Sequence, residues 1–132
     1  MPIFQLTESL SVAAQITPQD IPNLAAQGFT VVVCNRPDGE VPGQATMDEI
    51  EAACHAADLL FVRYPVDAVN FPGPDIEGLG ALFDDPGQSV LAYCRTGTRC
   101  ANLWVTSLSG DAQAAAAQTA REIGFDLSLV RA

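Results

Sequence analysis

Short apolar segments alternate with segments of helical character along this chain. The apolar segments predict β-strands at residues 3–6, 11–13, 29–34, 59–64 and 89–93. Segments with helical spacing or helix-capping residues predict helices at residues 17–28, 46–57, 75–83, 98–108 and 112–123. The alternation predicts an α/β fold, a three-layer sandwich in which helices flank a largely parallel central sheet of four to five strands.

Local signals mark the ends of several predicted helices. Thr17 followed by Pro18 predicts a helix start, because threonine caps the first amides and proline is preorganised for the first helical position. Gly28 predicts the end of that helix. Thr46 and Glu49 have the spacing of a capping box, which predicts the start of the next helix.

Three turn-rich loops follow predicted strands, at residues 35–43, 65–74 and 94–99. The carboxyl ends of parallel strands meet at one edge of a sheet, and ligands of such sheets bind there. We therefore expect these loops to surround a common site.

Length and composition narrow the functional classes. A chain of 132 residues is expected to form a single domain, residues 1–132, and it has no apolar run long enough to span a membrane. A net charge of −10 argues against binding of nucleic acid or of an anionic membrane surface. The first residues show no targeting signal, so a cytoplasmic location is expected. One histidine and four cysteines without a Cys-x-x-Cys spacing predict neither a metal site nor a cofactor.

The segment that starts at Cys94 carries the strongest chemical signal. A loop between a strand and a helix N-terminus directs backbone N–H groups at one point, so Cys94 is expected to be a thiolate nucleophile. Gly97 would let the backbone approach a bound anion closely. Arg99 is expected to clamp a small anionic substrate in catalysis. The expected substrate-binding residues of the same loop are Arg95, Thr96, Gly97 and Thr98.

Three motifs in order resemble one bacterial family. They are SVAAQITPQD at residues 11–20, NRPDGE at residues 35–40, and CRTGTR at residues 94–99 with its flanking residues. The chain resembles the β-lactamase-hydrolase-like, phosphatase-like domain family along nearly its whole length. The resemblance implies a dual-specificity-phosphatase-like fold. It also implies that Arg36 reaches the anion site as a substrate-binding residue, with a salt bridge or loop packing as the alternative role for this side chain.

The same resemblance implies two chemistries, because the active loop looks like that of single-domain rhodaneses. A cysteine-dependent phosphatase carries its arginine six positions after the nucleophile, where this chain has Cys100, whereas Arg99 stands at the fifth position. Tyr93 also replaces the histidine that usually precedes a phosphatase cysteine. These differences favour a rhodanese-like sulfurtransferase that forms a Cys94 persulfide from a sulfane-sulfur donor such as thiosulfate.

Two alternatives stay open. The first is a phosphatase that hydrolyses phosphomonoesters through a phosphocysteine, with Asp67 or Asp75 as the general acid. The second is a non-catalytic anion-binding module. Cys100 is a candidate resolving thiol that would form a disulfide with oxidised Cys94, or else a buried thiol in the place of a serine.

Overall fold

One five-stranded sheet forms the centre of the molecule in the computed structural model, which describes residues 2–131. Its strands lie in the order β1-β2-β5-β3-β4. The edge strand β1 is antiparallel to β2, and all other neighbours are parallel. The bounds are β1 Ile3–Gln5, β2 Leu10–Ala13, β3 Val31–Cys34, β4 Leu60–Arg63 and β5 Val90–Tyr93.

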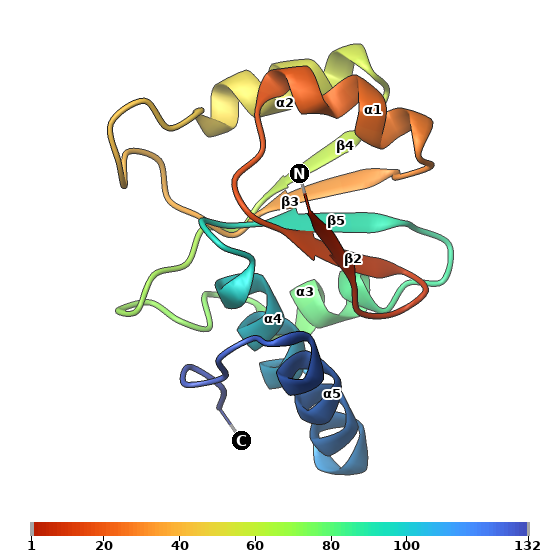
Figure 1. The fold of residues 1–132 in the computed structure, drawn as a ribbon, viewed down its shortest axis with the longest axis vertical. Helices are drawn as coiled ribbons and strands as arrows, with labels where there is room; N and C mark the ends of the chain where they lie inside the picture. Colours follow the sequence, from red (N-terminus) through yellow and green to blue (C-terminus); the bar gives the residue numbers. More distant parts are fainter. Residues whose placement is uncertain (1, 132) are drawn as a thin grey trace.

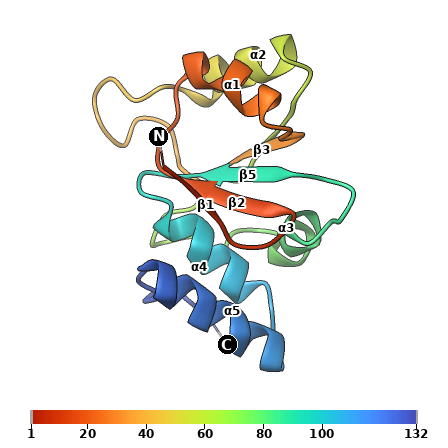
Figure 2. The same ribbon diagram turned by 45° about the vertical axis from the view of Figure 1, so that its right-hand side comes forward.

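Helices cover both faces of the sheet, so the expected three-layer α/β sandwich is confirmed (Figure 1). One face carries the 3-10 helix η1 (Pro18–Asp20) and helices α1 (Ile21–Ala26) and α2 (Met47–Ala56). The other face carries α3 (Ile76–Phe83), α4 (Thr98–Thr106) and α5 (Gly110–Ile123). Figure 2 shows α4 next to the sheet and α5 packed on the outer side of α4.

The central strands are buried on both faces because their side chains alternate between two apolar clusters. In β3, Val31 and Val33 pack in the cluster that includes residues of α3 and α4, whereas Val32 and Cys34 pack in the cluster that includes residues of α1 and α2. The apolar run at residues 29–34 was predicted to be such a buried strand, and the structure confirms a buried strand over its last four residues, Val31–Cys34.

The predicted helix at residues 17–28 is divided into η1 and α1. Pro22 lacks an N–H group, so it cannot donate the helical hydrogen bond to the carbonyl of Pro18. The N–H of Ile21 donates to that carbonyl instead, which closes a turn of 3-10 type. The single continuous helix was therefore the wrong prediction for this segment.

The capping box at the start of α2 is formed as predicted. The Glu49 N–H donates to Thr46 Oγ1 at 3.1 Å, and the Thr46 N–H donates to Glu49 Oε1 at 3.1 Å. This cap fixes the point where the chain returns from the 35–46 loop to the helix. Within residues 2–131, no helix is long and apolar enough to cross a membrane.

Candidate functional site

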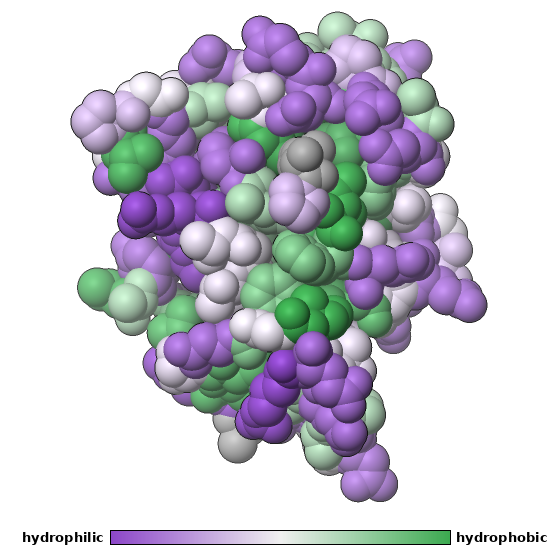
Figure 3. Space-filling model, in the orientation of Figure 1, coloured by the Kyte–Doolittle hydropathy of each residue, from purple (hydrophilic) through white to green (hydrophobic). Residues whose placement is uncertain are grey.

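Cys94 lies at the carboxyl end of β5, immediately before the loop that leads into α4. Figure 3 shows strongly hydrophilic side chains gathered at the left of the view, where β3 and β5 end and their loops emerge in Figure 1. The N–H of Cys94 donates to the carbonyl of Ala13 at 3.3 Å, which ties the loop to β2. The expected common edge for the three loops is thus present.

The loop is folded around the sulfur of Cys94. The N–H of Gly97 donates to Cys94 Sγ at 3.1 Å, and the nearby backbone N–H groups of Thr96, Arg99 and Cys100 help to lower the pKa of this thiol. Gly97 precedes α4 with φ 87°, a left-handed conformation that favours glycine. A Cβ at this position would meet its nearest atom, Cε1 of Phe125, at 3.4 Å, so backbone conformation rather than space selects glycine.

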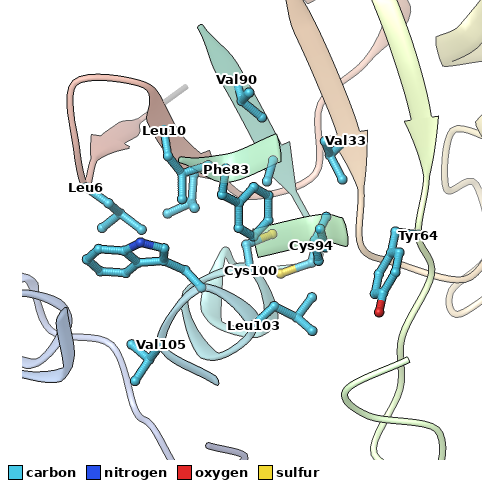
Figure 4. Close-up of a cluster of buried hydrophobic side chains, with 14 of the residues drawn as sticks. Leu6, Leu10, Val33, Tyr64, Phe83, Val90, Cys94, Cys100, Leu103 and Val105 are labelled. Atoms are coloured by element: carbon cyan, nitrogen blue, oxygen red, sulfur yellow. The ribbon is translucent and has the colours of Figure 1, made fainter. Parts of the chain in front are cut away.

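The second thiol of the site contacts the first. Figure 4 shows the side chains of Cys94 and Cys100 directed toward each other inside the apolar cluster. A hydrogen bond from the Cys100 thiol, supported by the backbone N–H groups, lowers the pKa of Cys94 to about 5 against the opposing effect of burial. Complete burial raises the pKa of Cys100. Cys94 is therefore a thiolate and Cys100 a thiol at neutral pH.

A carboxylate on a neighbouring loop holds Arg99. Glu40 Oε2 accepts from Arg99 Nη1 at 2.8 Å, and Glu40 Oε1 accepts from Arg99 Nη2 at 2.7 Å. Arg99 Nη1 also donates to the carbonyl of Val66 at 2.9 Å. The hydrogen bonds from Arg99 are the main reason that the pKa of Glu40 falls to about 2. Arg99 thus lies at the site, and both terminal nitrogens of its guanidinium group are hydrogen-bonded to Glu40.

Arg36 joins the same network from the loop after β3. Its Nε donates to Glu40 Oε1 at 2.7 Å, so this one carboxylate bridges Arg36 and Arg99. Its Nη1 donates to Gln15 Oε1 at 3.0 Å, and the N–H of Gln15 donates to the carbonyl of Arg95 at 3.4 Å. Arg36 is therefore connected to the Cys94 loop from both sides, through Glu40 and through Gln15, and its role in substrate binding stays a prediction.

The remaining loop side chains face the surface. Arg95 and Thr96 are exposed, and Thr98 is half-buried. The hydroxyl groups of Thr96 and Thr98 are hydrogen-bonded to each other at 2.9 Å. Arg95 is thus the more exposed of the two arginines in the loop.

The two candidate acids are acceptors in local turns. Asp67 Oδ1 accepts from the N–H groups of Val69 and Asn70, both at 2.9 Å. Asp75 Oδ1 accepts from the N–H of Gly78 at 3.0 Å and caps α3. Asp67 follows Val66, whose carbonyl binds Arg99, so its loop borders the site.

The sequence did not point to Glu40 or Gln15 as site residues. Glu40 lies four positions after Arg36 in a loop that leaves the carboxyl end of β3, and Gln15 follows β2 in the same way. Their position after parallel strands was the available signal. No group of three or more histidine, cysteine, aspartate or glutamate side chains among residues 2–131 is arranged to hold a metal ion.

Comparison with known proteins identifies the family. The family described as "Beta-lactamase hydrolase-like protein, phosphatase-like domain" matches residues 3–116. The chain belongs to this family. It is 33% identical over 105 residues to a β-lactamase hydrolase-like protein of Agrobacterium fabrum, a match that covers 80% of this chain and 24% of that protein. A relative from Xylella fastidiosa is 31% identical over 107 residues, with 81% and 25% covered. The chain therefore spans about a quarter of the length of these curated relatives.

Solved structures agree with this assignment. A candidate phosphatase from Neisseria meningitidis is 34% identical, with a TM-score of 0.74 and coverage of 92% of this chain and 89% of that one. PTPMT1 is 15% identical, with a TM-score of 0.72 and coverage of 92% of this chain and 82% of that one, so it shares the fold. PTPMT1 has also been solved in complex with PI(5)P. The family and the names of these relatives support the phosphatase alternative better than sulfur transfer, which none of the names mentions.

Proposed function

We propose that this phosphatase-like domain is a thiol-dependent sulfurtransferase. The observation that carries the proposal is the short loop: four residues separate Cys94 from Arg99, and the amides of this ring converge on the Cys94 sulfur itself. Such a ring is suited to holding one additional anionic sulfur atom on the cysteine. A phosphoryl group presents three oxygen atoms and calls for a wider ring.

The proposed reaction begins with the Cys94 thiolate. It attacks the sulfane sulfur of a donor such as thiosulfate, forms a Cys94 S–S bond, and breaks the S–S bond of the donor, which leaves as sulfite. The loop amides and the α4 N-terminus stabilise the resulting persulfide anion. Exposed Arg95 is placed to attract the anionic donor. Arg99, held by Glu40, lies beside the ring and adds positive charge near the sulfur.

The absence of a need for a proton donor also favours sulfur transfer. Sulfite leaves as an anion, whereas an alkoxide leaving group requires a general acid. Asp67 and Asp75 each accept backbone hydrogen bonds in their own turns. Neither carboxylate needs to leave its turn for a persulfide to form.

Phosphomonoester hydrolysis through a phosphocysteine is the second candidate. The family description and the similarity to a candidate phosphatase support it, and PTPMT1 shows that this fold occurs in complex with PI(5)P. In that reaction Asp67, on the loop that contacts Arg99, would protonate the leaving oxygen. A non-catalytic module that binds small anions is the third candidate.

One experiment distinguishes these functions. The reduced protein is incubated with thiosulfate and weighed intact, alongside Cys94→Ser. A mass gain of one sulfur atom in the unmodified chain, but not in Cys94→Ser, supports sulfur transfer. If the protein instead hydrolyses an aryl phosphate and forms no sulfur adduct, the proposed sulfurtransferase function is wrong and phosphatase activity takes its place. Failure of both reactions would favour the binding module.

A further inference from the structure

A cavity of about 490 Å³ adjoins the Cys94 loop and is not used by the reaction described above. It lies between the connection from β2 to η1 and the segment that precedes and begins α2, and Arg95 contributes to its wall. Its volume is within the range of roughly 300–1,000 Å³ found for sites that bind organic molecules. An inorganic sulfur donor would leave most of this space empty.

A buried guanidinium forms part of the cavity wall. Arg36 lines the cavity, and its side chain is 3% exposed. Glu40 and Gln15 accept from its Nε and Nη1, but its buried Nη2 has no hydrogen-bond partner among the described residues. A buried donor without a partner is unfavourable, so a small opening of the cavity wall that lets Nη2 bind an anionic group of a ligand would be compensated by the new hydrogen bond. Arg95, which lines the same cavity, adds a second positive charge.

The rest of the wall suits a carbon skeleton rather than a second anion. Ile16 and Val41 line the cavity, and Val41 is 37% exposed at the surface of its loop. Glu49 also lines it, with Oε1 bound within the capping box of α2. The cavity therefore combines a cationic part near the Cys94 loop with an apolar part.

We propose that this acceptor cavity binds a low-molecular-weight organic thiol that carries a carboxylate, and that this thiol is the sulfur acceptor. The proposal rests on the proposed sulfur transfer. The carboxylate would bind Arg36 Nη2 and Arg95, and the thiol would be directed toward Cys94. The acceptor thiolate attacks the outer sulfur of the Cys94 persulfide, a new S–S bond forms on the acceptor, and the bond to Cys94 breaks. Cys94 returns to its thiolate, and the acceptor's proton passes to water.

The test uses two acceptors of nearly equal size. The full chain is first loaded with thiosulfate, and loading is measured by intact mass. The persulfide is then mixed with N-acetylcysteine or with N-acetylcysteine amide, which lacks the carboxylate charge, and loss of the added sulfur is followed in time. In the unmodified chain we expect the carboxylate acceptor to react about tenfold faster, which corresponds to about 1.4 kcal/mol.

A charge placed in the cavity provides the decisive variant. Val41→Asp adds a carboxylate to the wall, so the preference for N-acetylcysteine should fall to about one. Because Val41 shares the cavity wall with Arg95, thiosulfate loading of this variant is measured first, and sulfur transfer is followed only from the loaded protein. Leu60→Asp is the matched control, since Leu60 is 60% exposed at the amino end of β4, away from the cavity. Leu60→Asp should show the same preference as the unmodified chain. Because all proteins are compared with the same two acceptors, an intrinsic difference in reactivity between the two thiols cancels when the preferences are divided by one another.

Arg36→Lys tests the proposed ligand atom separately. Lysine keeps a positive charge near Glu40 but lacks the Nη2 group, so the preference for the carboxylate acceptor should fall at least threefold. Equal preference in the unmodified chain and all three variants, with normal loading, would overturn the acceptor cavity and leave sulfur transfer intact. Failure of the unmodified chain to load sulfur would overturn both proposals.

Discussion

Replacing Cys100 with alanine tests how the site keeps Cys94 ionised. The Cys100 thiol makes the largest contribution to the low pKa of Cys94, which lies at about 5. A hydrogen bond to a charged group contributes about 1.5–3 kcal/mol, and one pKa unit corresponds to about 1.4 kcal/mol. Cys100→Ala should therefore raise the Cys94 pKa by about 1 to 2. The backbone N–H groups remain and should keep it below that of a free thiol.

The ultraviolet absorbance of the thiolate, titrated with pH, measures this change directly. Burial raises the pKa of Cys34, Cys54 and Cys100, and that of Cys54 to about 11, so Cys94 alone among the cysteines should ionise in the acidic range. Cys100→Ser retains a donor and should leave the Cys94 titration close to pH 5. Cys54→Ala removes a buried thiol away from the loop and should also leave it unchanged.

The comparison between the two Cys100 variants decides the outcome. Thermal unfolding of each variant establishes that it is folded before titration. A Cys94 pKa that stays near 5 in Cys100→Ala would show that the backbone N–H groups alone hold the thiolate. Equal increases in Cys100→Ala and Cys100→Ser would show that the side-chain donor is not the cause.

Three further outcomes are expected. Glu40→Gln should lower the free energy of unfolding by about 1 kcal/mol at neutral pH, a modest loss because water partly screens the ion pairs of Glu40. The pKa of Glu40 is depressed in the folded state, so this loss should disappear as the pH falls from about 4.5 to about 2. Urea unfolding of the variant and of the unmodified chain measures the difference. Asp67→Asn keeps the turn acceptor and should leave persulfide loading within about twofold, whereas a loss of about 10²-fold or more in aryl phosphate turnover would support the phosphatase. Mild peroxide should convert Cys94 to a sulfenate that condenses with the Cys100 thiol and releases water, so that the number of titratable thiols falls from four to two. Retention of all four thiols, or an equal loss in Cys100→Ser, would contradict this.

The strands, and the position of Cys94 at the end of one of them, could be predicted from the sequence because their signals are local. Buried strands appear as apolar runs, and the capping box of α2 is set by two residues three positions apart. The division of η1 from α1 was also encoded locally, in the missing N–H of Pro22, but a helix pattern on both sides concealed it. The single-domain prediction for residues 1–132, the cytoplasmic location and the resolving role of Cys100 stay predictions.

Residues 90–99 by themselves identify a cysteine at the end of a strand, a glycine suited to a left-handed turn and an arginine at the fifth position, because each depends on adjacent residues. The partner of that arginine depends on the order of the sheet. Placing β5 beside β3 brings Glu40 and Arg36 to Arg99 across a separation of 59 residues for the Glu40 contact. Packing of α4 against the sheet places the Cys100 thiol on the Cys94 sulfur and buries both. Such contacts arise only when distant segments fold together, since no periodicity or spacing in the chain specifies which loops become neighbours.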